Sequence, residues 1–275
     1  LDAVSIWTRV RWCYCNMSIE PRATYRVQLH AGFTLDDAAA LVDYLQALGI
    51  SHLYCSPYLQ AARGSTHGYD VVNPHRVNVE LGGEAARKRM VSALQARGMG
   101  QLLDIVPNHM AIGGDDNPWW WDVLKYGPAS RYASYFDVEW NPPEARHKDE
   151  VLVPVLGDQY GRVLENKEIQ LDASGPEFLV RYHQNSYPVD PRSLGPILSA
   201  AAQECGSAEL ADLAASYTEQ IPQPAVINRQ IAQRRQRQVA GLDERLQALR
   251  EAQPEVDAAV QSAVRAWNDS IDALD

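Results

Sequence analysis

The first 110 residues alternate between short apolar segments and amphipathic segments. Residues 23–29, 51–56 and 101–107 are rich in β-branched, aromatic and other apolar side chains, which predicts three strands. Residues 34–49 and 84–98 repeat apolar side chains at helical spacing, and each segment ends on a glycine, which predicts two helices. Strands that alternate with helices indicate βαβ units, and therefore an α/β fold with a parallel sheet.

The first predicted helix has a recognisable beginning and a predicted core face. Thr34 is followed three residues later by Asp37, which resembles a capping box, and Gly49 stands where a helix ends. The apolar stripe of this helix consists of Ala38, Leu41, Val42, Leu45 and Leu48.

The third predicted strand is unusual because both of its faces are apolar. Leu102 and Val106 lie on one side, and Leu103 and Ile105 lie on the other. A strand of this kind is typical of a sheet that is covered on both faces. Asp104 is the one charge within it, and a charge in a covered strand needs a partner.

A polar segment separates the second predicted strand from the second predicted helix. It reads GSTHGYDVVNP over residues 64–74, and its glycines and closing proline predict a loop. The loop carries His67, Tyr69 and Asp70 close together. Loops often carry function, but this composition alone does not establish it.

The character of the chain changes after residue 110. Asn117 at the N-cap, Pro118 at the first helical position and the pair Gly127–Pro128 predict a short helix that contains three consecutive tryptophans. Residues 137–192 are rich in Pro, Gly and Asp and predict irregular structure with a small sheet, whereas the chain becomes helical from about residue 196. A group of arginines in this part is interpreted as a solvated helix face: Arg229, Arg234, Arg235 and Arg237.

Composition narrows the class of protein. A chain of 275 residues with 46% apolar side chains can bury a large core, and its net charge of −10 argues against nucleic-acid and anionic-membrane partners. Four cysteines without paired spacing make zinc sites and disulfides unlikely, so a reducing cytoplasm is expected. Residues 1–16 precede a normal start at Met17, and we interpret them as upstream or otherwise non-native sequence, with a short ordered arm as the alternative.

Candidate chemistry gathers where the predicted parallel strands end. Sites in α/β folds form beyond the carboxyl ends of the strands, so Tyr69, Asp70, Asp104, Asn108 and His109 are expected to converge on one rim. Each has a structural alternative: Asp104 could belong to an ion pair, His109 could be a core histidine, and Tyr69 could serve packing. Together at one end of a sheet, they favour a binding pocket.

Two of these stretches resemble the α-amylase family of glycoside hydrolases and transglycosylases. GYDVVN follows the second predicted strand and DIVPNH lies on the third. The sequence around these motifs is similar to the maltooligosyl trehalose synthase branch of that family. The similar segments run from PRATYRVQL to GYDVVNP and from GMGQLLDIVPNHM to NPWWWDVL, and the similarity continues in YFDVEW and VLVPVLGDQYG. The resemblance covers about residues 21–190.

The resemblance implies a fold and a division of the chain. Residues 17–136 would form the first three strands of a catalytic (β/α)8 TIM barrel, and residues 137–275 a largely helical insertion that is truncated at its end. Within the barrel, Tyr69 would stack on the glucosyl unit at the cleavage point and Asp70 would hydrogen-bond beneath it. His109 would donate to the hydroxymethyl oxygen of that sugar.

Further positions carry supporting roles by the same resemblance. Asp104 would pair with the arginine that precedes the nucleophile on a fourth strand, and without that strand it would lack its partner. His67 and Trp120 would support the site. Asn108 would contact substrate; it stands where calcium-dependent members of the family place a metal ligand, but no second ligand set accompanies it, so we predict neither a metal nor a cofactor.

The family's nucleophile follows an arginine in an Arg-x-Asp motif, and no Arg-x-Asp occurs in the sequence. A retaining mechanism also needs a second carboxylate about 5 Å from the nucleophile. The chain alone is therefore expected to be an inactive fragment of an enzyme that converts the reducing-end α-1,4 bond of a maltooligosaccharide into an α,α-1,1 bond. The resemblance also implies a maltooligosyl trehalose trehalohydrolase as pathway partner. The alternatives are an amylase-type α-glucan hydrolase and a non-catalytic carbohydrate-binding remnant.

Overall fold

A computed structural model describes residues 20–219 and 229–270 of the chain. The chain forms two compact units, Leu1–Ala111 and Ile112–Asp275, which we call unit 1 and unit 2. The tryptophan-rich helix and the segment that follows it pack within unit 2, and the domain boundary after residue 136 stays a prediction. The predicted non-native extension, residues 1–16, lies outside the described residues.

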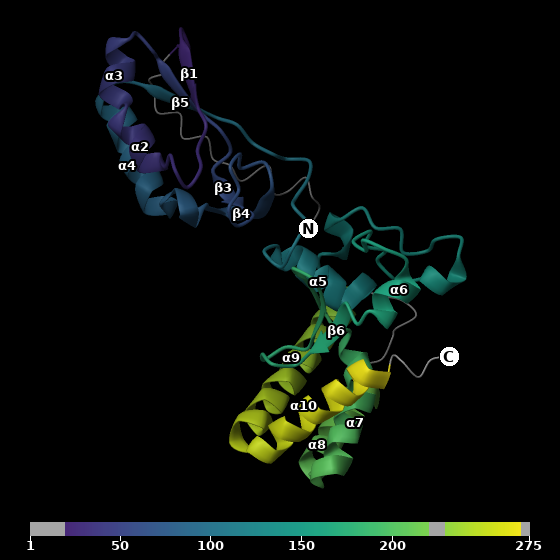
Figure 1. Ribbon diagram of the computed structural model, residues 1–275. Coiled ribbons are helices and arrows are strands. Elements are labelled where there is room, and N and C mark those ends of the chain that lie inside the picture. Colours follow the sequence, from purple (N-terminus) through teal and green to yellow (C-terminus); the bar gives the residue numbers. More distant parts are fainter. Residues whose placement is uncertain (1–19, 220–228, 271–275) are drawn as a thin grey trace. The chain divides into compact units, whose positions relative to one another are not determined.

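Unit 1 contains the predicted parallel sheet, in the order β1-β2-β5 (Figure 1). Its helices lie on one face of that sheet, where Leu35, Leu45, Leu53 and Met90 are fully buried and form much of the core. The pattern of strand, helix and strand read from the sequence is therefore confirmed. The elements are β1 (Thr24–Val27), α2 (Leu35–Ala40), α3 (Val42–Ala47), β2 (His52–Cys55), α4 (Gly83–Ala96) and β5 (Gly100–Leu103).

The first predicted helix begins as expected but is interrupted in its middle. Thr34 and Asp37 form the reciprocal capping box, and Gly49 takes the left-handed conformation at φ 88° that lets the chain turn after the helix. A turn at Leu41 divides the segment into α2 and α3. Ala38, Val42 and Leu45 stay buried across this turn, but Leu48 follows the last residue of α3 and is 56% exposed, so its predicted place in the core is wrong.

The polar segment of residues 64–74 is only partly a loop. Strand β3 (Leu59–Ala61) pairs antiparallel with β4 (Val71–Val77), so the predicted loop ends before Val71 and its last four residues belong to a strand. Pro74 is tolerated there because the pairing register shifts twice along this two-stranded ribbon. A short 3-10 helix, η1 (Val79–Leu81), then leads into α4.

Strand β5 is less covered than its composition predicts. Leu102, Leu103 and Ile105 are 38%, 36% and 55% exposed. The prediction of a strand that is covered on both faces is therefore wrong for the described residues. The reason is its position: β5 pairs with β2 along one edge, and the helices of unit 1 pack on a single face of the sheet.

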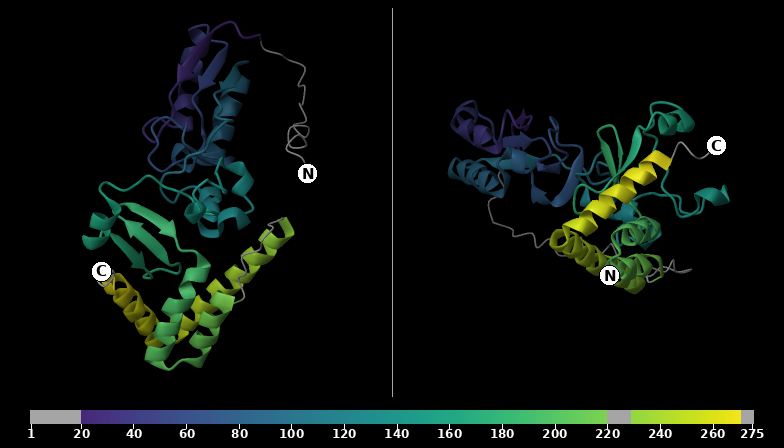
Figure 2. Two further views of the ribbon diagram at one scale, coloured as in Figure 1. Left: turned by 90° about the vertical axis from the view of Figure 1, so that its right-hand side faces the viewer. Right: turned by 60° about the horizontal axis from the view of Figure 1, so that its bottom comes forward.

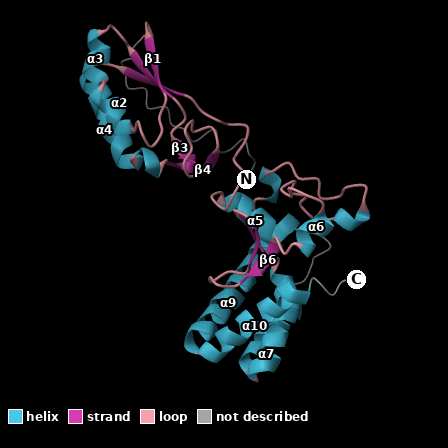
Figure 3. Cartoon of the chain, in the orientation of Figure 1, coloured by secondary structure: helices cyan, strands magenta, loops and turns pink. Residues whose placement is uncertain are grey.

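Unit 2 begins with the predicted tryptophan-rich helix. Asn117 caps it through its side-chain oxygen, which accepts hydrogen bonds from the backbone N–H groups of Trp119 and Trp120. A small antiparallel sheet and four longer helices follow, as predicted (Figures 2 and 3). The elements are α5 (Pro118–Tyr126), η2 (Gly127–Ala129), η3 (Ala133–Tyr135), η4 (Ala145–His147), α6 (Tyr160–Glu165), β6 (Ile169–Asp172), β7 (Leu179–Tyr182), β8 (Asn185–Pro188), η5 (Pro191–Ser193), α7 (Leu194–Cys205), α8 (Ala208–Glu219), α9 (Arg229–Ala252) and α10 (Pro254–Asp269).

The core of unit 2 lies among the last four helices. Leu198, Leu213, Tyr217, Val239 and Val260 are fully buried there, and each comes from an amphipathic helix that presents one apolar face to the others. None of the described helices is both long enough and apolar enough to cross a bilayer.

Candidate functional site

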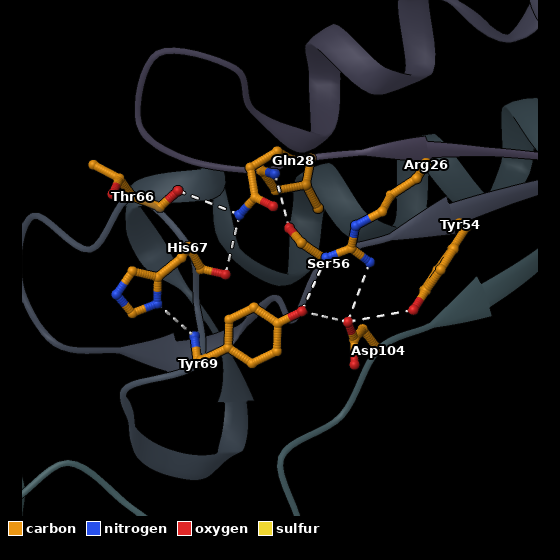
Figure 4. Close-up of polar contacts among 9 residues, drawn as sticks. Arg26, Gln28, Tyr54, Ser56, Thr66, His67, Tyr69 and Asp104 are labelled. Atoms are coloured by element: carbon orange, nitrogen blue, oxygen red, sulfur yellow. Dashed lines mark hydrogen bonds and ion pairs between the residues drawn. The ribbon is translucent and has the colours of Figure 1, made fainter.

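The carboxyl ends of the parallel strands in unit 1 carry a connected group of polar side chains (Figure 4). The hydroxyl of Tyr69 donates to Asp104 Oδ2 at 2.6 Å, and the guanidinium of Arg26 donates to both residues, at 3.0 Å to the tyrosine oxygen and 3.1 Å to the carboxylate. These residues come from β1, from the loop before β4 and from the end of β5. The strands therefore bring together at least part of the predicted rim.

Tyr54 of β2 completes this group. Its ring lies 4.6 Å below the guanidinium carbon of Arg26, and its hydroxyl lies 3.4 Å from Asp104 Oδ2. The aromatic face and the carboxylate together hold the arginine in one orientation. Asp104 thus has a cationic partner within unit 1, and the expectation that it lacks an arginine partner in this chain is wrong.

The electrostatics of the group fit a fixed carboxylate rather than a proton donor. The hydrogen bond from Tyr69, helped by Arg26, lowers the pKa of Asp104, and the same bond raises the pKa of Tyr69. A general acid works best with a pKa near the working pH. Asp104 is therefore suited to orienting its neighbours, and it is a poor candidate for proton transfer.

The loop that carries Tyr69 is held from two sides. Gln28, just after β1, donates to the backbone oxygens of Thr66 and His67 at 3.3 and 3.1 Å (Figure 4). Gly68 passes so close to the chain at the end of β2 that an added Cβ would lie 2.2 Å from the backbone oxygen of Pro57. Only glycine fits here, because the backbone also takes a φ of 78°.

Asp70 is tied into its own loop. Its Oδ1 accepts a short hydrogen bond from the hydroxyl of Ser65, and it lies 3.7 Å from Nδ1 of His67. The hydroxyl of Ser65 also accepts from the backbone N–H of Gly68. These contacts stiffen the loop around Tyr69.

Asn108 and His109 lie further along the segment after β5. Both side chains are exposed, and Nδ1 of His109 lies 3.2 Å from Oδ1 of Asn108. Among the described residues we find no hydrogen bond from either side chain to Tyr69, Asp70 or Asp104. The structure therefore brings Tyr69 and Asp104 into contact and leaves Asn108 and His109 as a separate exposed pair.

Sequence reasoning missed Arg26 and Gln28. They alternate with Val27 and Leu29, which are 5% and 1% exposed, so the polar pair shares one face of the extended chain and the apolar pair the other. Two long polar side chains two residues apart at the end of the first strand indicate that this strand also contributes to the rim.

The three tryptophans lie in unit 2. Because consecutive helical residues point in different directions, their side chains have different surroundings. Trp120 is 6% exposed and packs against Phe136, with the ring centroids 5.0 Å apart, so here it serves the core. Trp119 stacks on Tyr132 at 5.0 Å, and Tyr135 meets it edge-on. The predicted site-supporting role of Trp120 stays a prediction.

The surroundings of Asn108 offer few ligands for a metal ion. Within the described ranges, no group of three or more His, Cys, Asp or Glu side chains is placed to hold a metal ion. Asn108 itself is exposed and interacts with His109.

Known proteins are similar to this chain over about half of its length or more. A putative maltooligosyl trehalose synthase of Mycobacterium tuberculosis is 49% identical over 141 residues, which are 49% of this chain and 18% of the relative. The structure of maltooligosyltrehalose synthase from Arthrobacter ramosus is 41% identical, with a TM-score of 0.54 over 62% of this chain and 21% of that protein. A crystal structure of maltooligosyl trehalose synthase is 38% identical, with a TM-score of 0.57 over 62% of this chain and 23% of that protein.

The chain thus spans about a fifth of the length of each of these relatives. Residues 34–188, more than half of the chain, match the family model described as "Alpha amylase, catalytic domain". This match and the two structures support an α/β fold of the TIM-barrel type, in agreement with the parallel strands and helices of unit 1. The chain belongs to the alpha-amylase family.

Proposed function

We propose that this chain contributes the first substrate-binding elements of a maltooligosyl trehalose synthase, built on the opening strands of a (β/α)8 barrel. Such an enzyme converts the reducing-end α-1,4 bond of a maltooligosaccharide into an α,α-1,1 bond by retaining, intramolecular transglycosylation. The 49% identity to the M. tuberculosis relative supports this choice within the family. The proposed compartment is the cytoplasm, and the proposed pathway partner is a maltooligosyl trehalose trehalohydrolase.

The observation that carries the proposal is the way Tyr69 is held. Its hydroxyl is engaged by Asp104 and Arg26, while 36% of the residue remains exposed at the carboxyl end of the sheet. A partly exposed aromatic ring that is fixed by its polar end is suited to stacking on a sugar. Pre-organising the ring in this way also lowers the entropy that ordering it on binding would cost.

The other residues take roles around this ring. Asp70 would hydrogen-bond the sugar that stacks on Tyr69, and His67 would support the loop. His109 would donate to the hydroxymethyl oxygen of the same sugar, with Asn108 beside it, although this requires the segment after β5 to carry both residues toward Tyr69. We assign the nucleophile and the general acid to carboxylates outside this sequence, since Asp104 is committed to Tyr69 and Arg26.

Product analysis of the full-length enzyme tests the reaction. With maltopentaose as substrate, we expect a non-reducing product that carries an α,α-1,1 bond. Reducing sugars as the main product would instead establish an amylase-type hydrolase, and the absence of any conversion would leave carbohydrate binding alone. In contrast, the isolated 275-residue chain should convert no maltopentaose above a vector control.

Two variants of the full-length enzyme test the site. Tyr69→Ala should lower kcat/KM by about 100-fold, the scale expected when a positioning contact is lost. His109→Ala should lower kcat/KM more than it weakens oligosaccharide binding, because its hydrogen bond is proposed to tighten as the ring distorts. Tyr44→Ala is the matched control, since this tyrosine is 62% exposed on α3 and should leave both quantities unchanged. Equal effects of Tyr69→Ala and Tyr44→Ala would rule out the stacking role.

A further inference from the structure

Unit 2 contains a large cavity of about 1010 Å³ with a mixed polar and aromatic wall. The end of α5 contributes Lys125 and Tyr126, the segment before and after η4 contributes Trp140 and Lys148, and α9 contributes Arg235. The volume is that of a site for a small molecule.

Arg235 is the exceptional residue of this wall. The arginines around it were interpreted as a solvated helix face, and this is wrong for Arg235, which is only 7% exposed, whereas Arg234 and Arg237 are exposed. Its Nε is buried without a hydrogen-bond partner. Among the residues that the structure describes, we also find no ion pair to its guanidinium. A buried cation without a partner is costly.

Two cations on the same wall, unlike Arg235, already have carboxylate partners. Arg192 forms a bidentate pair with Asp190, with Nε 3.2 Å from Oδ1 and Nη2 2.5 Å from Oδ2, which leaves that carboxylate neutralised. Lys125 is held by Glu177 at 2.7 Å and by Asp243 at 3.0 Å. Burial accordingly lowers the pKa of Arg235, and the positive charge of Arg192 adds to this effect against the attraction of Asp190.

We propose that this cavity binds a small polar molecule through a phosphate or carboxylate group that pairs with Arg235. A sugar hydroxyl could accept a hydrogen bond from the guanidinium, but only an anion also supplies the missing charge. Trp140 and Tyr126 offer aromatic surface for the body of the ligand. Asp149 and Glu150 lie on the same wall, so a ligand with a single anionic group fits better than a polyanion.

Calorimetric titration of the 275-residue chain tests the proposal, at constant ionic strength set with chloride. The probes are inorganic phosphate, acetate and glucose 6-phosphate, with glucose as the uncharged control. We expect saturable binding at one site for at least one anion, tighter binding for glucose 6-phosphate than for phosphate, and none for glucose. Phosphate without acetate binding would identify a phosphate site, and the reverse a carboxylate site.

Matched variants locate the binding. Arg235→Gln should weaken anion binding at least tenfold, and Arg235→Lys should fall between it and the parent because it keeps the charge without the planar fork. Arg234→Gln removes the same charge from an exposed neighbour on α9 and should change affinity by less than twofold. No saturable anion binding by the parent chain would overturn the proposal, as would equal losses in Arg234→Gln and Arg235→Gln.

Thermal unfolding of the same variants distinguishes a lost anion site from a damaged fold. Without anions, Arg235→Gln should melt no lower than the parent, because it removes a buried and unpartnered charge. Adding phosphate should raise the Tm of the parent and of Arg234→Gln, but should not raise that of Arg235→Gln beyond the shift seen with chloride. A lower Tm for Arg235→Gln in the absence of anions would show that Arg235 serves the fold instead.

Discussion

The two units each contain a tyrosine, an aspartate and a cation in contact, yet the two groups have opposite surroundings. In unit 1, Asp104 accepts from Tyr69 at 2.6 Å and from Arg26 at 3.1 Å. In unit 2, Asp243 accepts from Tyr217 at 2.7 Å and from Lys125 at 3.0 Å. Tyr69 is 36% exposed, whereas Tyr217 is fully buried in the helical core.

The causes of the perturbed pKa values separate the two groups. The pKa of Tyr217 is raised first by burial and then by Asp243, whereas the pKa of Tyr69 is raised first by its hydrogen bond to Asp104. A group whose pKa is perturbed mainly by burial belongs to packing. One that is perturbed by a specific partner while it stays exposed is available to a ligand. The same three residue types therefore build a structural tie in unit 2 and a candidate site in unit 1.

Replacing the cation of each group should produce the largest difference. Lys125→Met removes the cation that pairs with both Asp243 and Glu177, and the lysine side chain it replaces is only 13% exposed. We expect a loss of about 2 kcal/mol in the free energy of unfolding, less than for a fully buried pair, because the two carboxylates are 32% and 44% exposed and water screens part of the cost. Arg26→Met should cost less than about 1 kcal/mol, as exposed pairs do. Urea denaturation of both variants checks this, and similar losses would contradict the comparison.

Gly68→Ala probes the close approach that positions Tyr69. The added Cβ would collide with the backbone of Pro57 at a φ of 78°, so we expect a loss of about 2 kcal/mol and a displaced loop. Gly64 has a similar φ of 74° with nothing within 4 Å of its added Cβ, so Gly64→Ala isolates the cost of the backbone conformation alone. Thermal unfolding should show the smaller loss for Gly64→Ala. Equal losses would mean that the approach to Pro57 does not matter.

Removing each tyrosine hydroxyl separates a stability effect from an electrostatic one. Tyr217→Phe deletes a buried hydrogen bond to Asp243 and should cost about 1 kcal/mol. Tyr69→Phe should change stability little, but it should raise the pKa of Asp104 toward the ordinary aspartate range because its largest lowering contact is gone. Carboxyl titration by NMR, with Tyr25→Phe as an exposed control on β1, measures that pKa. An unchanged pKa would remove Tyr69 from the group.

The smallest expected effect is the pH dependence of the stability that Asp104 contributes to unit 1. The pKa of Asp104 is lowered in the folded state, so its contribution to stability is present above the ordinary aspartate pKa of about 4 and is lost as the pH falls through the lowered value. The stability difference between the parent and Asp104→Asn should therefore be a few tenths of a kcal/mol near neutral pH and should vanish in acid. Denaturant titrations between pH 3 and 7 test this, and a difference that grows in acid would reverse the assigned sign.

Local patterns predicted the elements of both units well because their causes are local. The capping box of Thr34 and Asp37 and the cap at Asn117 depend on residues within one turn, and both are present. The small sheet between residues 169 and 188 and the four longer helices after it also follow their apolar periodicity. Leu48 departs from its predicted place because α3 ends at Ala47, which periodicity alone does not reveal.

The sequence alone was enough to show an α/β beginning, the strand ends that carry Tyr69 and Asp104, and the resemblance to the alpha-amylase family, since each depends on short motifs and spacing. Only the tertiary structure showed that Arg26 joins Tyr69 and Asp104, because that contact links strands 43 and 78 residues apart. It alone also showed which arginine of α9 is buried, since residues 234 and 235 have the same chemistry and differ only in the side of the helix on which they lie. Burial of one charge against a cavity is a property of the packed helices, and no pattern within a single segment contains it.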